Sequence, residues 1–159
     1  LGARLLRTDL VRQEMFSPDA AKLAYGEGRY QRSNRDRVYD EIFARARRLL
    51  PDGLSVVLDG TFLKSHQRKT AVDLATAAGT LPLIVHCECP DDVAKTRIRA
   101  RAKSGVSASE ARAELFQSQK SEQQPDPSGL PNLRVDTTTS VPWLVDEVLG
   151  RLSKGMNWQ

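Results

Sequence analysis

Asp9 and Arg12 have the types and the spacing for acid–base chemistry on a polar substrate. Asp9 follows a short strand-like stretch, and Arg12 comes one helical turn later, so the two side chains could share one side of a helix. A carboxylate in this position could accept a proton from an acceptor hydroxyl. The other interpretation is a helix cap, in which Asp9 only satisfies free backbone N–H groups at a helix start.

Asp59 closes an apolar run and is followed by Gly60 and Thr61. A carboxylate at the end of a buried strand is a common place to orient water bound to magnesium. Gly60 would let the backbone pass close to a ligand, although a plain turn explains a glycine equally well. Polar groups at any one strand exit are ordinary; their recurrence at several exits is more informative and is compatible with a site for a polar, phosphorylated ligand.

A third chemical feature is an alternating basic stretch over residues 95–103. Its members are Lys95, Arg97, Arg99, Arg101 and Lys103. On a helix Arg97 and Arg101 are i,i+4 neighbours of like charge, which costs roughly 0.2–0.5 kcal/mol per pair unless an anion compensates. Two interpretations are open: a solvated basic face, which charge runs usually form, and an arginine lid over phosphates.

Alternating strands and helices would position these residues. Near-continuous apolar runs predict strands at 54–59 and 81–87, with weaker candidates at 4–7 and 133–136. Helical spacing predicts helices over 34–50, 66–78, 91–101, 107–119 and 141–152, and prolines predict a loop over 123–131. We therefore expect an α/β fold with an open, mainly parallel sheet and helices on both faces. Ligands bind such sheets at the carboxyl ends of the strands.

Composition sets limits on the partners. The chain has 159 residues and a net charge of +4, which favours one domain and anionic ligands without singling out nucleic acid. It contains no apolar run near the roughly 20 residues that span a bilayer and opens on no signal-like segment, so we expect a cytoplasmic protein without a membrane partner. Cys87 and Cys89 are expected to be buried, reduced thiols.

Four segments together resemble the small P-loop kinases. They are Arg7-Thr8-Asp9-Leu10-Val11-Arg12, Val38-Tyr39-Asp40-Glu41, Val56-Val57-Leu58-Asp59-Gly60-Thr61-Phe62-Leu63, and Ser109-Glu110-Ala111-Arg112 with Gln119. Their order and spacing resemble the polynucleotide-kinase-like and zeta-toxin-like group, above all the ATP-binding module often fused behind an aminoglycoside-phosphotransferase-like domain in bacteria. The resemblance runs over nearly the whole chain.

The resemblance implies roles on the substrate side. Asp9 matches the carboxylate that activates the acceptor, and Arg12 matches an arginine that orients the substrate. Thr61 and Arg68 match further substrate-binding residues. The acceptor implied is a small molecule with a free hydroxyl.

The resemblance also implies ATP and Mg²⁺ as cofactors. Asp59 matches a carboxylate that reaches Mg²⁺ through water. Arg97 and Arg101 match lid arginines that bind ATP and stabilise the transferring phosphoryl group. A single domain over residues 1–159 would contain a helical substrate insert at about 11–50 and an arginine lid at about 95–112.

One part of the family pattern is missing. The family opens with a strand and Gly-x-x-x-x-Gly-Lys-Ser/Thr, the P-loop that holds the β- and γ-phosphates, and this motif is absent from the sequence. The family places that strand at the centre of its sheet, so without it we expect two half-sheets with unpaired inner edges. We expect the chain to be an N-terminally truncated fragment, shortened by about 20–30 residues, the length of one βα unit, and inactive alone.

The expected function of the intact protein is transfer of the γ-phosphate of ATP to a hydroxyl of a small molecule. A polynucleotide 5′-hydroxyl kinase is an alternative, less favoured because only 6% of residues are aromatic and could stack on bases. A nucleotide-binding or partner-binding module without catalysis is the other alternative.

Overall fold

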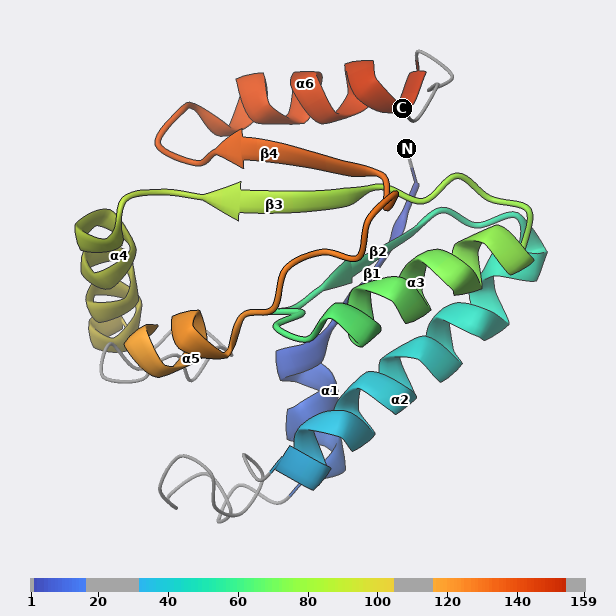
Figure 1. The fold of residues 1–159 in the computed structure, drawn as a ribbon, viewed down its shortest axis with the longest axis horizontal. Coiled ribbons are helices and arrows are strands. Elements are labelled where there is room, and N and C mark those ends of the chain that lie inside the picture. Colours follow the sequence, from blue (N-terminus) through green and yellow to red (C-terminus); the bar gives the residue numbers. More distant parts are fainter. Residues whose placement is uncertain (1, 17–31, 105–115, 154–159) are drawn as a thin grey trace.

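Parallel strands flanked by helices make up the structure, a computed structural model that describes residues 2–16, 32–104 and 116–153 (Figure 1). The described strands are β1 (Arg4–Arg7), β2 (Val56–Asp59), β3 (Ile84–Glu88) and β4 (Asn132–Asp136). The described helices are α1 (Thr8–Met15), α2 (Arg32–Leu49), α3 (Ser65–Ala77), α4 (Asp91–Ser104), α5 (Phe116–Glu122) and α6 (Val141–Ser153), with a 3-10 turn, η3 (Leu50–Asp52), after α2. The predicted α/β class is confirmed.

The described strands form two separate parallel pairs. β1 pairs with β2 from Arg4↔Val56 to Arg7↔Asp59, and β3 pairs with β4 from Ile84↔Asn132 to Glu88↔Asp136. Among the described residues, no strand hydrogen-bonds to both pairs, which is the arrangement of two half-sheets expected from the sequence. Because the pairing is parallel, the carboxyl ends within each pair meet at one edge, where α/β proteins bind ligands.

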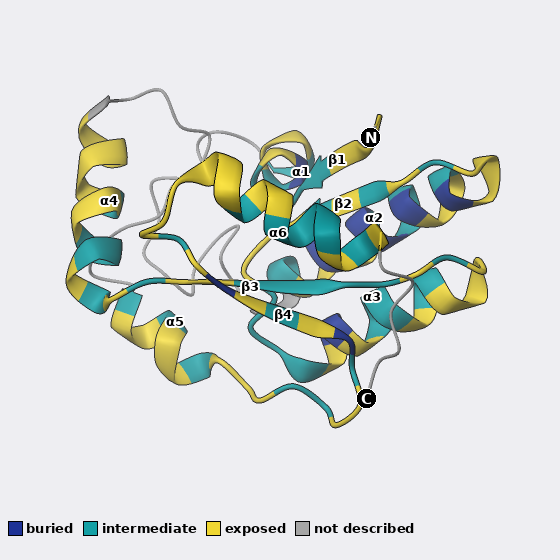
Figure 2. Cartoon of the chain, turned by 90° about the horizontal axis from the view of Figure 1, so that it is seen from above, coloured by how far each residue is buried: buried dark blue, intermediate teal, exposed yellow. Residues whose placement is uncertain are grey.

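The best-buried part of the described chain lies between α2 and the β1–β2 pair. Tyr39, Ile42 and Phe43 are buried and share one face of α2, because they are spaced three and four residues apart. Leu6 and Leu58, which are register partners on β1 and β2, pack against this cluster. Figure 2 shows buried positions repeating along α2. Packing against this cluster holds β1 and β2 in place on α2 and so positions the carboxyl ends of both strands.

The opposite face of the β1–β2 pair is open in the described structure. Leu5 and Val57, also register partners, keep 59% and 49% of their surface exposed. On the other pair Cys87 is exposed and Cys89 is half-buried. The prediction of a buried thiol is therefore wrong for Cys87, because β3 is exposed over its last two residues, Cys87 and Glu88.

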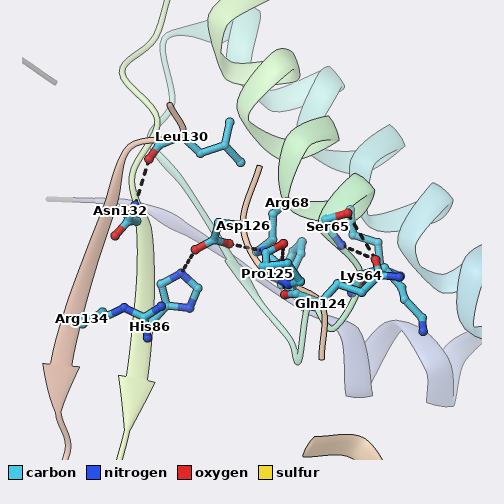
Figure 3. Close-up of polar contacts among 12 residues, drawn as sticks. Lys64, Ser65, Arg68, His86, Gln124, Pro125, Asp126, Leu130, Asn132 and Arg134 are labelled. Atoms are coloured by element: carbon cyan, nitrogen blue, oxygen red, sulfur yellow. Dashed lines mark hydrogen bonds and ion pairs between the residues drawn. The ribbon is translucent and has the colours of Figure 1, made fainter. Parts of the chain in front are cut away.

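A cluster of ionisable side chains joins the half of the molecule that contains the β1–β2 pair and α3 to the half that contains the β3–β4 pair (Figure 3). Asp126 lies between Arg68 of α3 and His86 of β3, with Oδ1 2.5 Å from Arg68 Nε and Oδ2 2.8 Å from His86 Nε2. The Arg68 contact is an ion pair without the alignment of a hydrogen bond. The guanidinium also donates to three backbone carbonyls, those of Phe62, Gln124 and Pro125. The loop before β4 is thereby tied to both α3 and β3.

The predicted helices are confirmed with small shifts, apart from one. The helix expected over 107–119 is described only from Phe116 onward, as α5, because residues 105–115 lie outside the described part of the chain. The loop predicted over 123–131 is confirmed. Within the described ranges no helix has both the length and the apolar character needed to cross a membrane.

Candidate active site

The carboxyl ends of β1 and β2 bring Arg7, Asp9 and Asp59 together. Arg7 and Asp59 are register partners at the last position of their strands, and α1 begins at the next residue, so Asp9 stands in its first turn. Arg7 donates from Nε to Asp9 Oδ1 at 3.1 Å and from Nη2 to Asp9 Oδ2 at 2.6 Å. Arg7 Nε also lies 3.7 Å from Asp59 Oδ2. The two aspartates singled out from the sequence thus share one guanidinium.

Asp9 also receives a backbone hydrogen bond at the helix start. Leu10 N donates to Oδ1 at 2.9 Å, whereas the N-cap residue, Arg7, makes no side-chain cap bond. Oδ1 therefore accepts two donors and Oδ2 one among the described residues. A carboxylate has about four lone-pair sites, so Oδ2 retains one for a further donor such as a substrate hydroxyl. The geometry is compatible with both interpretations of Asp9, base and cap.

The chain leaving β2 is shaped by close contacts with α1 and α2. A Cβ atom on Gly60 would lie 2.7 Å from Thr8 Cγ2 and 2.8 Å from Thr8 Oγ1, so only glycine fits there without movement. Phe62 adopts a left-handed φ of 42°, and its backbone N–H donates to the Tyr39 hydroxyl at 2.7 Å. That hydroxyl lies 3.4 Å from Thr61 Oγ1. Tyr39 thereby fixes the place of the predicted substrate residue Thr61.

Arg12 and Thr61 both influence the pKa of the buried Tyr39 hydroxyl. Burial raises the pKa of Tyr39, while the hydrogen bond with Thr61 and the positive charge of Arg12 oppose that rise. Arg12 is half-buried on α1 and has interactions within the protein. Its predicted role, and that of Thr61, in orienting a substrate stay predictions.

Arg68 differs from the other predicted substrate residues because its guanidinium is enclosed. Its side chain is 3% exposed, and its nitrogens face Asp126 and backbone carbonyls (Figure 3). These contacts account for a structural role at the junction of α3 and β3. A substrate role for Arg68 stays a prediction.

A second group of polar side chains lies at the carboxyl ends of β3 and β4. Arg97 of α4 donates from Nη1 to Thr137 Oγ1 at 2.9 Å and from Nη2 to Thr137 O at 2.8 Å. Asp136 accepts from the N–H and hydroxyl of Thr138, and these bonds lower the pKa of Asp136. An open cavity of about 440 Å³ lies beside them, lined by Glu88, Cys89, Pro90, Arg134, Val135 and Asp136.

The predicted arginine lid is described only in part. Residues 95–104 belong to α4, and residues 105–112 lie outside the described part of the chain. Arg97 and Arg101 are both exposed on this helix; Arg97 reaches the turn after β4, and Arg101 also has interactions within the protein. Their roles in binding ATP stay predictions.

The two strand pairs are linked electrostatically at their carboxyl ends. Partial burial raises the pKa of Cys87 on β3, and the negative charge of Asp59 at the end of β2 raises it further. Asp9 and Asp59 therefore form one group at the end of the β1–β2 pair, and Arg97 lies in a separate group with Thr137 at the end of the β3–β4 pair.

The described side chains could supply only some of the ligands of a magnesium ion. Among the described residues, no three His, Cys, Asp or Glu side chains gather closely enough to hold a metal by themselves. Mg²⁺ in phosphoryl-transfer sites is commonly held by one or two carboxylates, substrate phosphates and water. Asp59, whose side chain is 62% exposed, can supply one such carboxylate.

Sequence reasoning missed two residues of this site. Arg7 and Tyr39 both fall within segments that carry the family resemblance, but the resemblance implies no role for either residue. The sequence does carry a signal for Arg7: it is the last residue of the predicted strand 4–7, so it lies at the candidate edge, two residues before Asp9. For Tyr39 the sequence carries only its helical position, because its partner Phe62 lies 23 residues away.

The parallel strands and their flanking helices define an α/β protein. The chain belongs to the family described as an AAA domain, whose model matches residues 1–125. A solved structure from Chloroflexus aurantiacus, described as a "putative kinase", superposes with a TM-score of 0.68 and 26% identity, covering 97% of this chain and 84% of that one.

The curated relatives are longer proteins. Uncharacterized proteins of Mycobacterium tuberculosis and Mycobacterium bovis are 35% identical to this chain over an alignment of 118 residues, and the match covers 72% of this chain. The match spans only 23% of the length of those relatives.

Proposed function

We propose that the intact protein is an ATP- and Mg²⁺-dependent phosphotransferase that transfers the γ-phosphate to a hydroxyl of a small molecule. The observation that carries this proposal is the cluster of Asp9, Arg7 and Asp59 at the carboxyl edge of β1 and β2. It supplies a carboxylate with a free lone pair beside a second, exposed carboxylate. The family and the kinase-like structural match support the same class.

Asp9 is the proposed base. Its Oδ2 would accept the proton of the acceptor hydroxyl as that oxygen forms a bond to the γ-phosphorus of ATP. The bond between this phosphorus and the bridging oxygen breaks, and ADP leaves with the electron pair. Most of the rate in such chemistry comes from positioning and from stabilising charge, so the base need contribute only about 10²–10⁴-fold.

Asp59 is the proposed magnesium residue. When bound, Mg²⁺ would neutralise charge on the phosphate oxygens. Asp59 would orient it through water, which suits an exposed carboxylate with open space around it.

Arg97 and Arg101 are the proposed ATP-binding arginines. Arg97 bridges α4 to the turn after β4, so a small movement of α4 would carry its guanidinium over the strand ends. A planar guanidinium binds phosphate oxygens through two parallel hydrogen bonds. We also propose residues 95–112 as the lid and 11–50 as the substrate insert of one domain.

Transfer of labelled phosphate from [γ-³²P]ATP tests the proposal. The full-length protein would be incubated with Mg²⁺ and three acceptor sets: small polyols and sugars, nucleosides, and 5′-hydroxyl oligonucleotides. Label on a small acceptor supports the proposal, and label only on oligonucleotides supports a polynucleotide kinase. Nucleotide binding without transfer to any acceptor or to water supports a non-catalytic module.

A further inference from the structure

Arg7 occupies the central position of the candidate site, yet no role has been assigned to it. Its guanidinium uses two nitrogens on Asp9 and places one of them 3.7 Å from Asp59. The side chain is 33% exposed, so the contact lies at the accessible edge of the strands rather than in the core. The attraction of Asp9 raises the pKa of Arg7, so this residue stays positively charged.

We infer that Arg7 is a positioning residue of the proposed phosphotransferase: it orients the Asp9 carboxylate and limits how tightly the neighbouring Asp59 attracts a divalent cation. This inference rests on the proposed function of the same site. Arg7 would therefore have two effects of opposite sign. It would raise the rate of transfer by orienting the Asp9 carboxylate, and it would lower the affinity of the site for a divalent cation.

The first effect follows from the two parallel hydrogen bonds. A guanidinium that donates to both oxygens of a carboxylate fixes its plane as well as its position. With Leu10 N on Oδ1, this leaves one lone-pair site on Oδ2 of Asp9 among the described contacts. A neutral residue at position 7 would let the carboxylate rotate, and a misplaced base slows transfer without a matching loss of nucleotide binding.

The second effect follows from charge. Asp9, Asp59 and Arg7 together carry one net negative charge when all three are ionised. Replacing Arg7 with a neutral residue would leave two negative charges at the same edge. A divalent cation would then be attracted more strongly, by about two- to fivefold, the range expected for exposed ion pairs.

The test compares Arg7→Gln and Arg7→Lys with the wild-type full-length protein. Arg4→Gln is the matched control, because it removes the same charge from the other end of β1, where Arg4 is exposed. Binding of Mn²⁺ with a non-hydrolysable ATP analogue would be followed by water-proton relaxation. Turnover would be followed as Mg²⁺-dependent release of ADP from ATP.

We expect Arg7→Gln to tighten Mn²⁺ binding about two- to fivefold and to lower kcat by on the order of tenfold or more. Arg7→Lys should recover the wild-type metal affinity but only part of kcat, because lysine keeps the charge and loses the two parallel bonds. Arg4→Gln should change neither. Weaker metal binding in Arg7→Gln, or a kcat within twofold of wild type, would overturn the inference.

Asp59→Asn separates this inference from the proposed function. If Asp59→Asn weakens Mn²⁺ binding and Arg7→Gln does not tighten it, the role of Arg7 fails while the site stands. If the wild-type protein neither binds Mn²⁺ with the nucleotide analogue nor releases ADP, the proposed function fails and the role of Arg7 fails with it.

Discussion

Gly60 and Thr8 approach so closely that a methyl group on Gly60 would lie 2.7 Å from Thr8 Cγ2. This contact joins the residue after β2 to the first residue of α1. The positions of Asp9 and Asp59, each next to one of these residues, therefore depend on a glycine at position 60.

Gly60→Ala should lower the free energy of unfolding by about 1–3 kcal/mol, the usual effect of forcing a methyl group into a packed contact. Urea unfolding measures this change. Thr8→Ala in the same chain should restore part of the loss because it removes both atoms that clash. Gly150→Ala is the control: it lies in α6 with nothing within 4 Å of a new Cβ, and it should stabilise by about 0.5–1 kcal/mol. Equal effects at both glycines would contradict the contact.

Tyr39→Phe should destabilise the protein by about 1–3 kcal/mol, because Phe62 N–H would lose its acceptor.

The free energy of unfolding that Tyr39 contributes should also depend on pH. Burial raises the pKa of Tyr39 above its ordinary value of 10.0, so the folded state holds this proton more tightly than the unfolded chain does. The contribution of Tyr39 is therefore complete below pH 10.0 and is lost as pH rises through the higher folded-state pKa.

Urea unfolding of the wild type and of Tyr39→Phe from pH 8 to 11 checks this prediction. The stability difference between the two proteins should be constant up to about pH 9.5 and then shrink, as the unfolded chain ionises near pH 10. A difference that grows with pH would mean that the folded state favours the tyrosinate.

Asp126→Asn should be among the most destabilising single changes in the described structure, at about 3–5 kcal/mol, because it leaves Arg68 buried without its carboxylate. Thermal or urea unfolding measures it. Asp73→Asn removes the carboxylate of an exposed pair with Lys69, both side chains being 58% exposed, and should cost under about 1 kcal/mol. If Asp126→Asn were as mild as Asp73→Asn, the cluster would not hold the two halves together.

Arg97→Gln should leave stability within about 0.5 kcal/mol, since its contacts with Thr137 are exposed. Its effect on turnover should be large, on the order of 10²-fold in kcat, if its guanidinium stabilises the transferring phosphate. Arg99→Gln, on the same helix and exposed, is the control and should have little effect on either quantity. Equal loss of turnover in both variants would favour a general basic face over a lid.

The fold was largely predictable because helical spacing and apolar runs within short stretches of sequence predict its helices and strands. The helical spacing of Val38, Ile42 and Phe43 predicted α2, and a continuous apolar run predicted β2. The separation of the strands into two pairs also follows the expectation from the family resemblance.

Contacts between distant residues were not predictable. The family resemblance implies a substrate role for Arg68, but it does not reveal its carboxylate partner, Asp126, which comes from a loop far along the chain. The exposure of Cys87 depends on which elements cover β3, and strand composition does not encode that. The bridge from Arg7 to Asp59 required the strand register, which an apolar run leaves open.

Asp9→Asn in the full-length protein tests the central claim most directly. Asparagine keeps the size of the side chain and the acceptor oxygen for Leu10 N, but it cannot take a proton from a hydroxyl. The account predicts that transfer from [γ-³²P]ATP falls by about 10²–10⁴-fold while the Kd for ATP changes less than threefold. Transfer at the wild-type rate would contradict the assignment of Asp9 as the base and leave it as a helix cap.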